Sequence, residues 1–230
     1  KKWKDDKFAL PLFLTTLFVQ ALILGGTIIV FGVQLYDRDS SQLWNLASVF
    51  TWGSAFIFFV LADILVPFIF FSWFAALALI PIPWFIGSAF DMEIAGLALL
   101  HMVWGLILSV VSEAVHRFDK TRKFSLPMLL ASIPTFTLAL INAFDNGVPL
   151  GFAIALGVAC MYAVLHLIRA RGWLWALALL NFIMAYFAFF NLPLFDKTEI
   201  YFGYLLLGLS VLFLLPDLFS KNDFNKNIHW

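Results

Sequence analysis

The sequence predicts an all-α membrane protein, a polytopic bundle of about eight transmembrane helices. Of its 230 residues, 63% are apolar and only 12% are charged, against roughly 45–50% and about 25% in ordinary globular domains. Apolar runs of about 18 or more residues recur along nearly the whole chain, and each is long enough to cross a hydrocarbon layer about 30 Å thick. These observations exclude a soluble fold of this size.

The apolar runs divide into eight predicted spans. The least obvious division lies within residues 43–90, where Asp63 is the only charged residue. One helix of that length would reach roughly 70 Å, so the chain must turn back once, and Pro67 marks the turn. The predicted spans are 8–34, 43–61, 65–86, 94–115, 126–143, 149–167, 173–190 and 200–218.

Three further prolines, at two places, are expected to disturb helices inside the predicted spans. The sequence IPIPW at residues 80–84 predicts a break or kink at the outer end of the third span. Ile133 and Pro134 predict an interruption of the fifth. Proline lacks the backbone N–H that an interior helical position donates, and its ring clashes with the preceding turn. A broken helix that lines a cavity is one way to build a transport site, and a packing kink is the alternative.

The placement of Lys and Arg predicts the topology, because cytoplasmic loops retain positive charge. With eight spans and a cytoplasmic N-terminus, only Arg38 and Lys197 of the 14 basic residues fall outside. Merging the second and third spans removes this bias. We therefore predict that both termini are cytoplasmic, in a bacterial-type inner membrane, and that the segment after Lys7 is a retained span and not a signal peptide. The predicted outside loops are 37–42, 89–93, 145–148 and 192–199.

A short internal echo indicates a duplicated architecture. Residues 7–14, KFALPLFL, reappear as residues 123–130, KFSLPMLL, with five of eight positions identical. The repeated unit would contain four helices, residues 1–120 and 121–230, within one integral-membrane domain. Because four is even, the two halves would have the same orientation in the membrane. The alternative is chance alignment of Leu-rich and Phe-rich helices that share a good helix start.

Three polar side chains are predicted near the bilayer midplane: Gln20, His101 and Asn181. Each is expensive to bury in hydrocarbon unless it finds a partner, so each is a candidate site residue. We expect them to face the bundle interior and to form a hydrogen-bonding site for a polar solute or a lipid headgroup. The alternative is that they hold helices together, at about 0.6 kcal/mol for each contact.

A second polar cluster is predicted at the cytoplasmic ends of two spans. Glu113 and His116 are three residues apart on one helix face, and His166 lies at the same depth on another span. An ion pair of Glu113 with a neighbouring Arg or His is the favoured explanation, and a metal or haem site is the alternative. We therefore predict no metal. The single cysteine, Cys160, excludes an internal disulfide and a Cys-based zinc site.

The composition leaves three classes of function. Fourteen basic and fourteen acidic residues give no net charge, so the chain lacks the basic surface of a nucleic-acid-binding protein. The leading prediction is a small-solute or lipid transporter or channel. The first alternative is a non-catalytic membrane subunit of a respiratory, photosynthetic or secretion complex, and the second is an intramembrane lipid or isoprenoid enzyme.

Catalytic residues stay unknown, and a non-enzymatic role is favoured. Phosphate-loop, nucleophile-elbow and His-Glu-x-x-His motifs are all missing from the sequence. Glu113, His116, His101 and His166 form the only credible acid–base set. No cofactor is predicted, although the 28 phenylalanines and nine tryptophans leave haem, pigment and quinone as alternatives. The expected partners are the lipid bilayer and other membrane subunits or further copies of the chain.

Overall fold

A computed structural model describes residues 14–22, 25–26, 29, 42–65, 68–192 and 208. Within these residues every regular element is a helix. The predicted first and eighth spans, 8–34 and 200–218, fall largely outside the described residues. The count of eight spans, the duplication and the sidedness therefore stay predictions.

Six helical segments of the described chain are long and apolar enough to cross a membrane. They match the predicted second to seventh spans, including the division of residues 43–90 into two segments. The protein is therefore all-helical in its described part, with the composition of an integral membrane protein. The six segments are Gln42–Leu65, Phe70–Ala89, Ile94–His116, Arg122–Asn146, Val148–Arg169 and Gly172–Phe190.

The chain divides into two compact units, residues 1–92 with 107–134 and residues 93–106 with 135–230. In the described chain, unit 1 contains α2 (Gln42–Leu65), α3 (Ile69–Ala78), α4 (Ile82–Ala89), the second part of α5 (Ile94–His116), the short helix η2 (Arg122–Phe124) and the first part of α6 (Ser125–Asn146). Unit 2 contains the remaining parts of α5 and α6 together with α7 (Val148–Arg169) and α8 (Gly172–Phe190).

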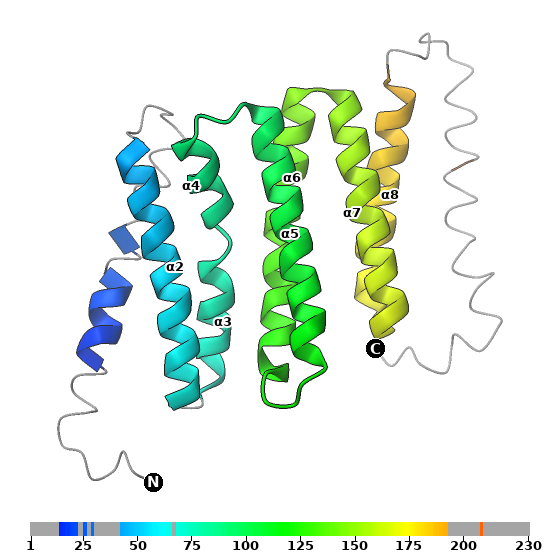
Figure 1. The fold of residues 1–230 in the computed structure, drawn as a ribbon. Coiled ribbons are helices and arrows are strands. Elements are labelled where there is room, and N and C mark those ends of the chain that lie inside the picture. Colours follow the sequence, from blue (N-terminus) through cyan, green and yellow to red (C-terminus); the bar gives the residue numbers. More distant parts are fainter. Residues whose placement is uncertain are drawn as a thin grey trace. The chain divides into compact units, whose positions relative to one another are not determined.

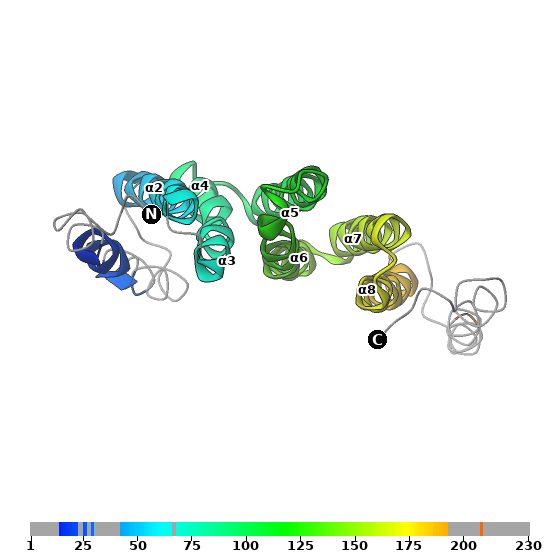
Figure 2. The same ribbon diagram turned by 90° about the horizontal axis from the view of Figure 1, so that it is seen from below.

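Unit 1 is built around α2, which lies against both α3 and α4 (Figures 1 and 2). The span facing α2 is interrupted, because α3 ends at Ala78 and α4 begins only at Ile82. At the interruption Leu79 N–H donates to the Ala76 carbonyl and Ile80 N–H donates to the Leu77 carbonyl, at 3.1 and 3.2 Å. The break predicted from the prolines at 81 and 83 is confirmed, but it lies near the middle of the span Phe70–Ala89 and not at its outer end.

Helix α2 has the polarity expected of a helix between protein and lipid. Its outward side chains recur every seven residues: Leu43, Phe50, Ile57 and Ile64 are 77%, 75%, 58% and 67% exposed. Its inward face is partly polar and consists of Asn45, Ser48, Trp52, Ala55, Phe59, Ala62 and Asp63. In water this arrangement would be unfavourable, whereas in a bilayer the outward face contacts hydrocarbon.

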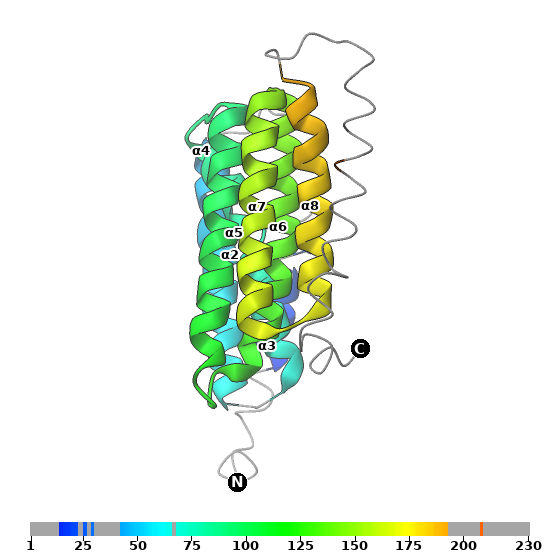
Figure 3. The same ribbon diagram turned by 90° about the vertical axis from the view of Figure 1, so that its right-hand side faces the viewer.

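Unit 2 contains the antiparallel pair α7 and α8, which lie side by side (Figures 1 and 3). Helix α7 begins after Gly147, whose φ of +141° is accessible to glycine because it has no Cβ. The turn between α6 and α7 therefore falls at Gly147, inside the predicted loop 145–148. Glycine also allows close packing at Gly105, where a Cβ atom would lie only 2.6 Å from the Phe136 ring.

The predicted interruption at Pro134 is wrong, because α6 runs unbroken through this residue from Ser125 to Asn146. Proline removes a single backbone donor, and helices packed among neighbours tolerate that loss within a membrane. Pro81 and Pro83 break the span Phe70–Ala89, because two backbone donors are lost and two rings clash within a single helical turn.

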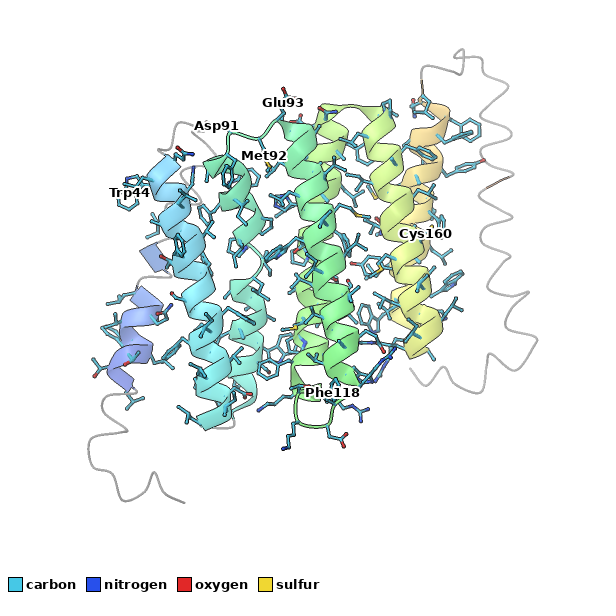
Figure 4. All side chains as sticks on the ribbon, in the orientation of Figure 1. Trp44, Asp91, Met92, Glu93, Phe118 and Cys160 are labelled. Carbon is cyan, nitrogen blue, oxygen red and sulfur yellow. The ribbon has the colours of Figure 1, made fainter. Side chains whose placement is uncertain are left out.

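Charged residues gather near the ends of the described spans. Glu93 precedes α5 and Phe118 follows it, so these two residues mark its opposite ends (Figure 4). Within residues 42–192 every basic residue lies at or between the ends of α5 and α6 or of α7 and α8. If each span crosses the membrane once, all of them share one side, as the predicted topology requires. They are Arg117, Lys120, Arg122, Lys123, Arg169 and Arg171.

Candidate functional site

The most polar buried contact described in unit 1 joins Asp63 to Lys123. Asp63 lies two residues before the end of α2, and its side chain is fully buried. Its Oδ2 forms an ion pair with Nζ of Lys123, which comes from η2 and is 36% exposed. The same Nζ lies 3.5 Å from the Asp63 backbone carbonyl. A buried carboxylate needs such a partner, because the loss of its hydration costs several kcal/mol.

The surrounding structure holds Lys123 in place. Helix η2 lies against α3, and Nζ of Lys123 stands 5.7 Å from the centre of the buried Phe124 ring. Before η2, the Thr121 hydroxyl donates to the Val115 carbonyl at 3.1 Å. After it, the Ser112 hydroxyl donates to the Ser125 carbonyl at 2.6 Å. These contacts fix the loop between α5 and α6 so that the ammonium group reaches Asp63.

Further polar groups lie on the same inward face of α2. The Ser48 hydroxyl donates to the Trp44 carbonyl at 2.9 Å and is thereby satisfied within its own helix. The indole Nε1 of Trp52 is buried and has no hydrogen-bond acceptor among the described residues. Since α2 packs against the interrupted span α3–α4, unit 1 combines an unused donor, a buried charge pair and a helix break.

His101, predicted near the midplane, is fully buried in unit 2. Its Nδ1 lies 2.8 Å from the Leu97 carbonyl oxygen. A carbonyl can only accept, so we assign the hydrogen to Nδ1, which leaves Nε2 as an acceptor in the neutral ring. His101 therefore has the chemistry of a buried hydrogen-bonding residue, as the sequence predicts.

The other two predicted midplane residues differ in their settings. Asn181 is buried in α8, where its Nδ2 donates to the Leu177 carbonyl at 2.8 Å while its Oδ1 is buried with no donor among the described residues. Gln20 is partly buried and belongs to unit 1, unlike His101 and Asn181. No described contact joins the three, so a common site of Gln20, His101 and Asn181 stays a prediction.

In the predicted cytoplasmic-end cluster, Glu113 forms an ion pair at the end of α5. Glu113 Oε1 lies 3.5 Å from Nε of Arg117, the residue that follows the end of α5, and this is the ion pair favoured from the sequence. His116 ends the same helix. Within each unit, the described residues include no group of three His, Cys, Asp or Glu side chains that could hold a metal ion.

His166 belongs to unit 2 and has a structural role at the turn between α7 and α8. It is buried, its Nδ1–H donates to the Arg171 carbonyl at 2.9 Å, and its ring lies 5.6 Å from that of Trp175. Its own carbonyl accepts the N–H of Ala170, whose φ is +49°. His166 thus stabilises a left-handed helix end, a conformation that is unfavourable for residues other than glycine.

Comparison with protein-family models, with curated proteins and with solved structures finds no match for this chain.

The pairing of Asp63 with Lys123 is the contact that sequence reasoning missed. A signal is present in the sequence, since Asp63 is the only charge within residues 43–90 and a buried charge requires a partner. Lys123 was assigned to the positive side of the membrane and to the internal echo. Their separation of 60 residues along the chain hid the contact, because helix periodicity relates only residues on one helix.

Proposed function

We propose that the protein is a membrane transporter for a small polar solute. The observation that carries this proposal is the interruption of the span Phe70–Ala89 between Ala78 and Ile82. Non-helical backbone is tolerated at membrane depth only where it is buried in protein or lines a polar cavity. Transporters use such broken helices to present polar backbone groups to their substrates.

The polar face of α2 supports this assignment. It packs against both halves of the interrupted span, and Trp52 brings a buried N–H donor that uses no described acceptor. A buried donor without a partner is unfavourable by about 1–3 kcal/mol. A solute with a hydrogen-bond acceptor would remove that penalty, so we place the solute contact at Trp52.

The test is solute exchange by the full chain reconstituted in lipid vesicles. The probes are radiolabelled amino acids, hexoses, nucleosides and short carboxylates, each measured by counterflow against protein-free vesicles. The variant Pro81→Ala/Pro83→Ala should restore a continuous helix and reduce exchange at least about tenfold, a difference of about 1.4 kcal/mol in the barrier. Pro149→Ala is the matched control, because Pro149 lies in the first turn of α7, where proline is compatible with the helix.

Two results would contradict the proposal. In one, the double proline variant exchanges solute as fast as the native protein. In the other, no solute of the four classes crosses faster than in protein-free vesicles. If, in addition, the purified chain is monodisperse only in the presence of fixed partner proteins, we conclude that it is a subunit of a membrane complex and not a transporter.

A further inference from the structure

We propose that the loop between α5 and α6 binds the headgroup of an anionic phospholipid, with Lys120 and Arg122 as the residues that contact its phosphate. The loop, residues 117–123, contains four basic residues and one acidic residue. It joins two segments that are long and apolar enough to cross a membrane, Ile94–His116 and Arg122–Asn146. A loop in this position lies at the depth of the lipid headgroups. The proposal does not depend on a transport role.

Two of the four basic residues of the loop are already paired within the protein. Arg117 pairs with a glutamate of α5, and Lys123 pairs with the buried Asp63. Lys120 and Arg122 are exposed, and neither forms an ion pair with another described residue, including the single acid of the loop. The charges of these two residues are therefore available to an external anion.

Hydrogen bonds hold the backbone of the loop in place. The Thr121 hydroxyl donates to the Val115 carbonyl, and the Thr121 N–H donates to the Phe118 carbonyl, both at 3.1 Å. The Phe124 N–H donates to the Thr121 carbonyl at 2.9 Å, and the Phe124 side chain is buried. The two unpaired cations flank Thr121 in the sequence, so a fixed backbone presents them. Little backbone entropy is then lost when an anion binds.

Exposed apolar side chains adjoin these cations in the sequence. Phe118, at the lower end of α5 in Figure 4, is 66% exposed, and Leu126, in the first turn of α6, is 50% exposed. A phospholipid carries acyl chains next to its phosphate, whereas a free phosphate ion has no group that would contact them. Arginine binds phosphate oxygens in pairs, and basic residues at a membrane surface attract anionic lipids. The loop therefore fits a phospholipid better than a free anion.

The test measures which lipid the full chain retains. The protein in detergent micelles is immobilised and equilibrated with an equimolar mixture of phosphatidylglycerol and phosphatidylcholine with identical acyl chains, and the bound lipids are quantified by mass spectrometry. Phosphatidylglycerol should be preferred by about fivefold to 25-fold at low salt, because each unpaired cation contributes about fivefold and the acid of the loop opposes them. The preference should fall as sodium chloride is raised from about 0.02 M to about 0.5 M, because salt screens exposed charges.

Three variants test the assignment to this loop. Arg122→Gln should lower the preference about fivefold, and Lys120→Gln/Arg122→Gln should remove it. Asp119→Asn removes the exposed acid of the loop and should raise the preference. The matched control is Arg171→Gln, which removes one exposed arginine at the turn between α7 and α8 and should leave the preference within about twofold of the native value.

A separate measurement distinguishes a lipid from a free anion. Inorganic phosphate should displace no more phosphatidylglycerol than sodium chloride of the same ionic strength, because phosphate lacks acyl chains. Greater displacement by phosphate would overturn the proposal and assign the loop to a free anion.

The proposal is also overturned if the native chain retains the two lipids equally, if the double variant keeps the preference, or if Arg171→Gln lowers it as much as Arg122→Gln. The capture measurement involves no movement of solute, so this proposal and the proposed function can fail separately.

Discussion

Removing Lys123 should destabilise the protein more than neutralising Asp63, because the two partners differ in exposure. Lys123→Met leaves a fully buried carboxylate without its counter-ion, a change worth about 3–5 kcal/mol in comparable buried pairs. Asp63→Asn leaves an ammonium group that is already 36% exposed and can turn to water, so about 1 kcal/mol is expected. In the double variant neither charge remains, and the loss should be about 1–2 kcal/mol.

The assay is equilibrium unfolding by sodium dodecyl sulfate in mixed micelles at pH 8, followed by the fluorescence of the nine tryptophans. The four proteins of the cycle give a coupling energy, expected to be about 2–5 kcal/mol, which isolates the pair from other effects of each substitution. The reasoning is refuted if Lys123→Met lies within about 1 kcal/mol of the native protein, or if Asp63→Asn is the more destabilising change.

Three further predictions concern other parts of the chain. Replacing His101 with Leu should remove solute exchange in the vesicle assay while the protein still inserts and folds, and full activity of this variant would exclude a midplane site there. Replacing Gly105 with Ala should destabilise the fold by about 1–3 kcal/mol, because the new methyl group meets the Phe136 ring; the control Gly53→Ala has open space and should be neutral or stabilising in the same unfolding assay. A single cysteine at Lys120 in a cysteine-free background should react with an impermeant maleimide only from the cytoplasmic side, and labelling from the outside would contradict the predicted topology.

The sequence was sufficient to predict the spans that the structure describes. Each span is a long run of consecutive apolar residues. Such a run forms a helix in the bilayer with all its backbone hydrogen bonds made internally, so its own sequence is enough to identify it. The turn at Gly147 and the break near Pro81 were also predictable, because glycine and proline act on their own backbone. Pro134 shows the limit of this reasoning, since its neighbours decide whether a helix breaks.

The site was less predictable, because the hydrogen-bond and ion-pair partners of buried side chains depend on how the helices pack. His101 and Asn181 were expected to be buried, and they are. His166 was grouped with Glu113 by depth alone, and its contact with the Arg171 carbonyl, five residues away, depends on a left-handed turn that no sequence rule indicated. The Asp63 partner also required the tertiary structure, which brings η2 to α3 and the end of α2.

The proposed transport role requires that α2 turns a polar face toward a solute path and an apolar face toward lipid. Cysteines at Ser48, which is 4% exposed, and at Phe50, which is 75% exposed, test this at nearly the same depth. In a cysteine-free background, an impermeant methanethiosulfonate reagent should react with the cysteine at position 48 and not with that at position 50, because only a water-filled path provides reactive thiolate. Reaction at position 50 without reaction at position 48 would contradict the account.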